Sequence, residues 1–117
     1  VAAIAPAIDY YLRFDEGDET LPLMYDDAEA ARQDSATLHV HPLNWPRNVW
    51  FACDPSDVRW WESADRLRMK LGALGIPHET DLETSSGGHG FEYYNAMAEG
   101  AVAFLLARLE QERLRVP

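Results

Sequence analysis

The stretch NVWFACDPSDVRWWESADRLRMKLGALGIPHETDLE, residues 48–83, decides the fold class of this chain. Its first six residues, 48–53, form an almost wholly apolar run that is too short for a helix and typical of a strand buried on both faces. Its last six residues, 78–83, form another strand candidate. The segment between them has helical periodicity, so the stretch predicts strand, helix and strand in succession.

The intervening helix is predicted over about 55–74. Asp54 is a good helix-capping residue, Pro55 suits the first helical position, and Asp57 places an acid in the first turn. Gly75 suits the left-handed position that ends a helix, and the proline two residues later prevents its resumption. One face of this helix is apolar and should be buried; it consists of Trp60, Ala64, Leu67, Leu71 and Leu74.

The same alternation extends to both ends of the chain. An apolar run opens the sequence, residues 9–18 have the acidic and aromatic composition of a surface loop, and Asp26-Asp27 precede a short helix. The buried face predicted for the last helix consists of Tyr94, Ala98, Ala101, Leu105 and Leu109. The predicted strands are 1–8, 48–53 and 78–83, and the predicted helices are about 26–34, 55–74 and 91–114. This order predicts an α/β fold, with helices packed on a parallel sheet.

Composition restricts the partners. The chain has 117 residues and a formal net charge of -10, from 10 Lys and Arg against 20 Asp and Glu. Such a surface repels nucleic acid and anionic membranes, and no apolar run approaches the roughly 20 residues that span a bilayer. The single cysteine, Cys53, excludes an internal disulfide and a multi-cysteine zinc site. No signal peptide is visible, and we expect a cytoplasmic location.

Two predicted loops place titratable residues where parallel sheets bind ligands, at the carboxyl ends of the strands. Asp54 and Asp57 follow the second strand, and His89 lies in the glycine-rich turn after the third. Histidine suits general-base work near neutral pH, and a buried carboxylate beside it would orient the ring. Acid and base on adjacent loops make two-thirds of a Ser-His-Asp arrangement, in the order found in α/β-hydrolases.

Each of these residues also has a plain structural interpretation. Asp54 and Asp57 could serve only to cap a helix, and His89 could be an incidental loop residue. His39 and His41 alternate on a strand-like segment and could clamp a metal, although no third ligand lies nearby. Among the other candidates, His78 is read as structural, Cys53 as a small core residue, and the four tryptophans as packing residues.

Three segments together resemble a known family. They are VWFACDPSD at 49–57, ALGIPHE at 73–79 and GGHGFEYY at 87–94. The chain from about 46 to 109 is similar to the C-terminal region of the putative-esterase family of α/β-hydrolases, which includes esterase D-like and S-formylglutathione hydrolases, feruloyl esterases and mycolyltransferases.

The resemblance implies a serine carboxylic-ester hydrolase that acts on a small-molecule ester. It implies that His89 is the catalytic base and Asp57 the acid, with Asp54 as the reserve acid. It implies no metal and no organic cofactor. Residues 9–25 are a candidate for part of a lid over such a site.

One family feature is missing from these 117 residues, which contain no Gly-x-Ser-x-Gly. None of the serines, at positions 35, 56, 63, 85 and 86, lies in a strand–turn–helix context. We therefore expect the nucleophile and the oxyanion-hole amides upstream of Val1, and expect residues 1–117 to form a single partial domain that is inactive alone. A homo-oligomer and pairing with the missing N-terminal half are both open. The alternative functions are a non-catalytic α/β binding module and, third, a metal-dependent hydrolase using His39, His41 and an acid.

Overall fold

The structure, a computed structural model, describes residues 1–116 and confirms the α/β class. Three parallel strands, β1 (Ala2–Ile4), β2 (Trp50–Ala52) and β3 (Glu79–Asp81), form one sheet in the order β1-β2-β3. Ala2 lies opposite Trp50, and Trp50 lies opposite Glu79. Because all three strands run the same way, their carboxyl ends meet at one edge of the sheet.

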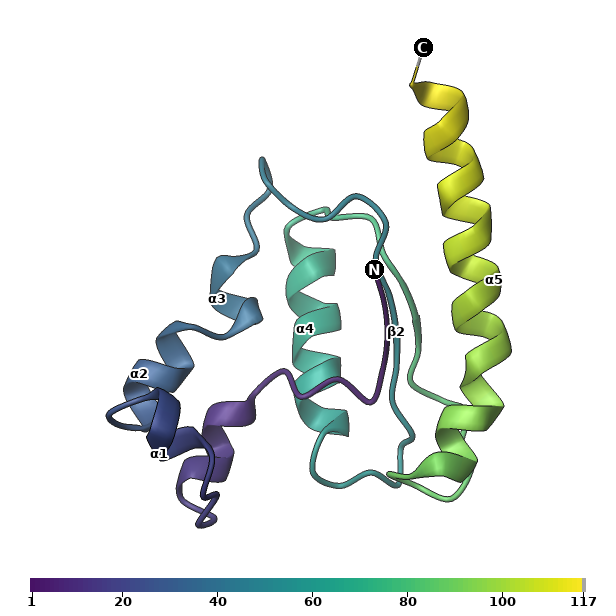
Figure 1. Cartoon of the computed structure of the whole chain (residues 1–117). Coiled ribbons are helices and arrows are strands. Elements are labelled where there is room, and N and C mark those ends of the chain that lie inside the picture. Colours follow the sequence, from purple (N-terminus) through teal and green to yellow (C-terminus); the bar gives the residue numbers. More distant parts are fainter. Residues whose placement is uncertain (117) are drawn as a thin grey trace.

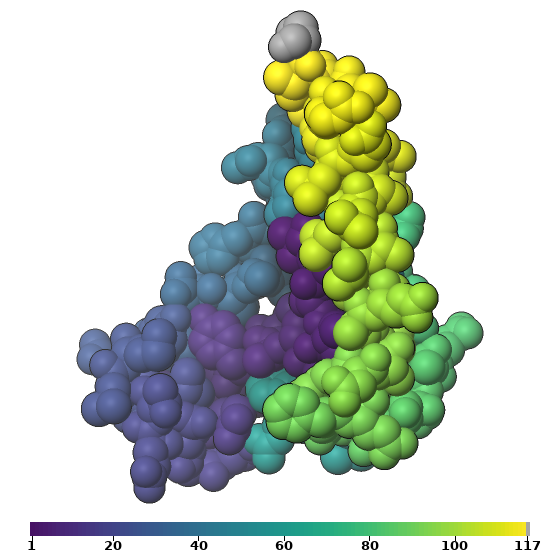
Figure 2. All heavy atoms as spheres, turned by 45° about the vertical axis from the view of Figure 1, so that its right-hand side comes forward, coloured from purple at the N-terminus to yellow at the C-terminus, as the bar shows by residue number. Residues whose placement is uncertain are grey.

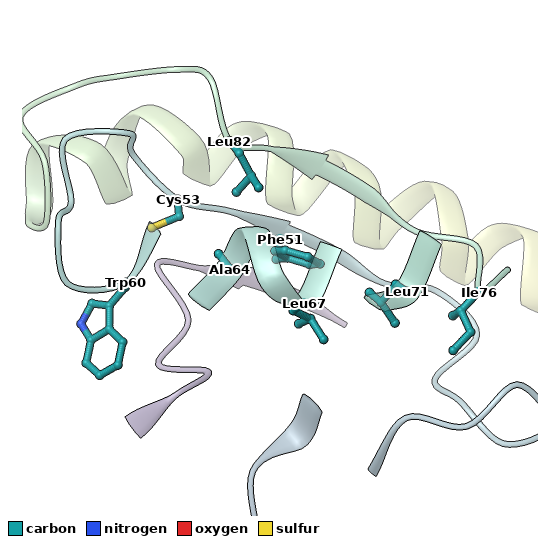
Figure 3. Close-up of a cluster of buried hydrophobic side chains, with 8 residues drawn as sticks. All are labelled: Phe51, Cys53, Trp60, Ala64, Leu67, Leu71, Ile76 and Leu82. Atoms are coloured by element: carbon teal, nitrogen blue, oxygen red, sulfur yellow. The ribbon is translucent and has the colours of Figure 1, made fainter. Parts of the chain in front are cut away.

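The two long helices cover opposite faces of this sheet (Figure 1). Successive side chains of a strand point to opposite faces, so β2 contributes to two cores. Phe51 packs with the residues of α4 (Trp61–Ala73), and Figure 3 shows it beside Leu67. Trp50 and Ala52 pack on the other face against α5 (Phe91–Arg115). The prediction of a strand buried on both faces is therefore confirmed.

The predicted apolar face of α4 is confirmed over most of its length. Trp60, Ala64, Leu67 and Leu71 are buried, and Leu74 is partly buried beside them. Gly75 has a φ of +69°, and the next amide, that of Ile76, donates to the Leu71 carbonyl, which is the helix ending that the sequence predicted. Burying a leucine side chain as fully as Leu71 contributes about 1.5–3 kcal/mol.

The predicted start of this helix is wrong, because α4 begins at Trp61 and not at residue 55. Residues 54–60 form turns in which the Asp57 amide donates to the Asp54 carbonyl, and the Trp60 and Trp61 amides donate to the Asp57 carbonyl. The Asp54 carboxylate accepts from the Ser56 amide as a helix cap would, but Asp54 and Asp57 are also bonded to the loop that follows β3. Contacts distant in sequence therefore override the local start signal.

The strands are shorter than predicted, with three residues each instead of six to eight. The first strand ends at Ile4, because the next residue, Ala5, has a left-handed φ of +52° and Pro6 has no amide to continue the ladder. The third ends at Asp81, whose carboxylate accepts from the amides of Glu83 and Thr84 and so folds the chain into a turn.

Residues 9–40 are more helical than predicted. A 3₁₀ helix, η1 (Tyr10–Phe14), lies within the segment read as a surface loop, and short helices α1 (Leu21–Met24) and α3 (Ala36–His39) flank the predicted one. That predicted helix is present as α2 (Ala28–Gln33), where the Asp27 side chain accepts from the Ala30 amide at 2.8 Å. Figure 2 shows this segment, purple to blue, standing at one side of the main body.

The buried face of α5 differs from the prediction by about one residue. Its buried residues are Tyr93, Met97, Ala101 and Phe104, whereas Leu109 is 66% exposed. At 1.5 Å per residue the 25-residue helix is about 38 Å long, and each three-residue strand is only about 10 Å long. The C-terminal turns of α5 thus extend past the sheet (Figure 1). Neither α5 nor any other helix within residues 1–116 is long and apolar enough to cross a membrane.

Candidate active site

The loops that follow β2 and β3 meet at the carboxyl edge of the sheet (Figure 1, bottom) and bring His89 against Asp57. His89 Nδ1 lies 2.7 Å from Asp57 Oδ2, although 32 positions separate the two residues in the chain. The acid and the base named from the sequence are thus in direct contact. Because an ionised carboxylate only accepts hydrogen bonds, Nδ1 carries the proton in this pair.

The two partners differ in their access to solvent, as an acid–base pair requires. The Asp57 side chain is 3% exposed, and its Oδ1 accepts from the Trp60 amide at 3.4 Å. The His89 side chain is 46% exposed and lies edge-on to the Tyr94 ring, with 5.7 Å between ring centroids. With Nδ1 bonded to the buried acid, Nε2 is the nitrogen left for a reacting group.

Asp54, the reserve acid, lies in the same pair of loops but does not contact His89. It is fully buried and accepts five hydrogen bonds from its own loop and from the loop of His89. Burial raises the pKa of this carboxyl, but the hydrogen bonds from Ser56, Ser86 and Ser85 outweigh burial and hold the pKa well below its usual range. Of the two candidate acids, Asp57 alone has the geometry to orient the imidazole.

A cleft of about 370 Å³ lies beside this pair. Its lining comes from the loop after β2, from His89 and from η1, and comprises Arg13, Ser56, Asp57, Val58, Arg59, Trp60 and His89. Arg13 lies 3.4 Å from Asp18, and Arg59 pairs with Glu16, so both guanidinium groups are partly neutralised. Sequence reasoning missed Arg13 and Arg59. No local motif marks them, because the η1 segment is brought to the cleft by tertiary contacts.

No serine hydroxyl in residues 1–116 is hydrogen-bonded to His89. Ser56 and Ser85 donate to Asp54, and Ser86 donates to Glu92 at 3.3 Å. The other two are tied to backbone carbonyls within their own segments: Ser35 to Arg32 and Ser63 to Trp60. The described residues therefore hold an acid–base pair without a serine nucleophile.

Cys53 does not fill that role. Its side chain is fully buried, and burial, followed by the negative charge of Asp57, raises the pKa of the thiol to about 12. The thiol Sγ donates to Asp57 Oδ2 across 3.8 Å. A protonated, inaccessible sulfur is a core group, as the sequence indicated.

His39 and His41 do not lie on the strand-like segment that the sequence suggested. His39 ends α3, where its Nε2 lies 2.8 Å from the Gln33 carbonyl, and the His41 Nδ1 accepts from the Leu43 amide at 3.1 Å. His78 lies at the start of β3, with Nδ1 2.8 Å from the Ile76 carbonyl. Throughout residues 1–116, no group of three or more His, Cys, Asp or Glu side chains is arranged to hold a metal ion.

In comparisons with protein-family models, curated proteins and solved structures, nothing matches this chain.

Proposed function

We propose that this chain is the histidine-and-acid portion of a serine carboxylic-ester hydrolase with the α/β-hydrolase fold. The observation that carries the proposal is the 2.7 Å contact between His89 Nδ1 and the buried Asp57 carboxylate, at the carboxyl edge of a parallel sheet. The nucleophilic serine and the oxyanion-hole amides come, in this proposal, from sequence preceding Val1. The substrate is a small-molecule ester, and the enzyme is cytoplasmic.

In the proposed reaction, His89 moves one proton in each half. Its Nε2 takes the proton from the serine hydroxyl as the oxygen attacks the acyl carbon, and then gives that proton to the departing alcohol. In the second half Nε2 takes a proton from water, which attacks the acyl-enzyme, and returns it to the serine oxygen. Asp57 fixes the ring with Nδ1–H toward itself and stabilises the imidazolium that forms twice in the cycle.

The free edge of the sheet also supports the proposal. Among the described residues β1 pairs only with β2. An apolar groove lies between β1 and α4. Val1, Pro6, Ile8, Val40, Leu67 and Leu71 are among the residues that line it. An additional strand and helix, which a nucleophile elbow would bring, would pair with this edge and bury this apolar surface.

The test uses the protein that includes the sequence preceding Val1. We expect a fluorophosphonate probe to label one serine there, and His89→Ala to lower kcat for a p-nitrophenyl ester by about 10⁴-fold or more. His78→Ala is the matched control. His78 directly precedes β3, at the amino ends of the strands and away from the candidate site, so its replacement should leave kcat unchanged. Absence of labelling in the folded protein would support the non-catalytic module, and near-normal activity of His89→Ala would remove His89 from the mechanism.

Asp57→Asn tests the role of the acid. An asparagine in this position can present either its NH₂ group or its carbonyl oxygen to His89. It therefore selects the tautomer with Nδ1–H less strongly than the carboxylate of Asp57 does. In serine proteases this exchange lowers kcat by about 10⁴-fold, and we expect a loss of that order. Asp81→Asn is the control, because Asp81 ends β3 at this edge but its carboxylate bonds only to Glu83 and Thr84.

A further inference from the structure

The buried carboxylate of Asp54 joins the two loops of the candidate site. Oδ1 accepts from the Ser56 amide at 2.8 Å and from the Ser56 hydroxyl at 2.6 Å, both within its own loop. The Ser85 hydroxyl also donates to Oδ1, at 2.8 Å. Oδ2 accepts only from the other loop, from the Ser86 amide at 2.6 Å and the Gly88 amide at 2.9 Å.

The turn that Asp54 holds is the one that presents His89. Gly87 and Gly88 have φ values of +78° and +77°, the left-handed region that glycine adopts without steric cost. In this turn the amides of Ser86 and Gly88 both donate to the same carboxylate oxygen, Oδ2 of Asp54. The second of these amides belongs to the residue immediately before His89, so the bond at Gly88 fixes the start of the histidine's own backbone.

We propose that Asp54 is a positioning residue for His89: its carboxylate locks the 85–88 turn to the 54–57 loop and thereby sets the distance between the imidazole and Asp57. Asp54 does not contact the imidazole, and it acts only through the backbone that carries it. The inference rests on the proposed function for its catalytic consequence. The structural part, that the His89–Asp57 contact depends on Asp54, can be tested without any activity.

Asp54→Asn is the sharpest perturbation because it preserves the shape of the side chain. An NH₂ group in place of Oδ2 faces the Ser86 and Gly88 amides, and one in place of Oδ1 faces the Ser56 amide, so in either orientation it meets at least one backbone amide that can only donate. A donor against donors costs free energy that the isosteric volume cannot restore. The turn should therefore move away from the 54–57 loop, and His89 should move with it.

The first measurement is NMR of the 117-residue chain. In the wild type, the His89 Nδ1–H bonded to a buried carboxylate should give a strongly downfield proton resonance. In Asp54→Asn that resonance should be lost or broadened, while the amide resonances of α4 and α5 keep their positions. Asp81→Asn, the matched control, should retain the resonance. Retention in a folded Asp54→Asn chain would overturn the proposal.

Ser85→Ala keeps the outcome decisive if Asp54→Asn does not fold. It removes the Ser85 hydroxyl bond to Asp54, and the longer 3.5 Å contact with the Ser56 hydroxyl, and leaves the carboxylate in place. We expect partial broadening of the His89 Nδ1–H resonance, and an unchanged resonance would contradict the proposal. Ser56→Ala is its control, because the Ser56 hydroxyl bonds to Asp54 from the same loop and reaches the other loop only through the 3.5 Å contact with the Ser85 hydroxyl.

The second measurement is kinetic and uses the protein with the sequence preceding Val1. A displacement of about 1 Å at a catalytic group lowers turnover by about 100-fold, so Asp54→Asn should lower kcat by about that factor with KM within about twofold. A folded Asp54→Asn enzyme with kcat within about twofold of the wild type would overturn the proposal. If the resonance is lost in Asp54→Asn but the wild type hydrolyses no ester and takes no fluorophosphonate, the positioning role stands and the proposed function fails.

Discussion

Removal of the hydroxyl oxygen of Tyr93 should stabilise the protein. It is fully buried in the first turn of α5 and packs with Trp50, Ala52 and Met97 between the helix and the sheet. Its hydroxyl has no hydrogen-bond partner among the described residues. Burial, and after it the charge of Asp81, raises the pKa of this hydroxyl well above its usual value, so it is a neutral and unsatisfied donor.

The expected gain follows from that environment. A buried polar group without a partner costs about 1–3 kcal/mol, and Tyr93→Phe removes the group while keeping the ring contacts. The vacated space is that of one oxygen atom, and its lost dispersion contacts cost a few tenths of a kcal/mol. We therefore expect the free energy of unfolding to rise by about 1 kcal/mol. With a urea m-value of about 1–2 kcal/mol/M, the midpoint should rise by roughly 0.5–1 M.

Urea unfolding followed by tryptophan fluorescence and by circular dichroism measures this change, and coincident transitions justify the two-state treatment. Tyr94→Phe is the matched control, since the neighbouring ring is only partly buried and should change stability by less than about 0.5 kcal/mol. A loss of 1 kcal/mol or more in Tyr93→Phe would refute the reasoning, because it would mean that the hydroxyl has a partner in solution.

The remaining predictions concern the two loops of the candidate site and helix α5. Asp54 has a folded-state pKa below its ordinary value of 3.8, so the unfolded chain binds more protons in acid and stability should fall as pH drops below about 4. In urea titrations at several pH values, the stability difference between wild type and Asp54→Asn should narrow toward about pH 2; a constant difference would contradict this. Gly88→Ala should cost about 1–2 kcal/mol, since φ is +77° there although the nearest atom to an added Cβ, Ser56 Oγ, is an ordinary 3.5 Å away. Gly100→Ala, within α5, where an added Cβ would lie 3.9 Å from Trp50 Cζ2, should instead stabilise by about 0.5–1 kcal/mol in the same assay. Cys53, buried with its pKa raised to about 12, should react with iodoacetamide only when urea unfolds the chain, and rapid alkylation of the native protein would contradict its placement in the core.

The sequence predicted His89 and its two candidate acids as members of the site, but it predicted their geometry only in part. Glycines around His89 and acids directly after β2 are local signals, and the rule that parallel strands end at one edge brings them together. The same acids were also read as the start of a helix at Pro55, which is wrong. That reading failed because the donors that Asp54 takes, the Ser86 and Gly88 amides, lie more than 30 positions away in the chain.

The surroundings of the site carried no such local signal. Arg13 borders the cleft beside His89 because its segment is attached to α4 by the ion pair between Asp9 and Arg66, and to the loop before α4 by the ion pair between Glu16 and Arg59. Charged residues of this kind are common on any surface, and nothing in their spacing predicts which acid meets which base. The short helices flanking α2 were missed for a related reason, since four-residue helices depend on what they pack against more than on their own propensity.

The sequence alone determined the α/β class, the apolar face of α4, and that His89 and two candidate acids, Asp54 and Asp57, follow strands that end at the same edge of the sheet. These follow from periodicity and from backbone chemistry at glycine and proline, which act over a few residues and are written in the order of the chain. Tertiary structure alone decided that Asp57 and not Asp54 contacts His89, where α4 begins, and which face of α5 is buried. Each of those outcomes depends on which distant donors and side chains compete for the same carboxylate or the same stretch of sheet, and such competition is settled only when the elements pack together.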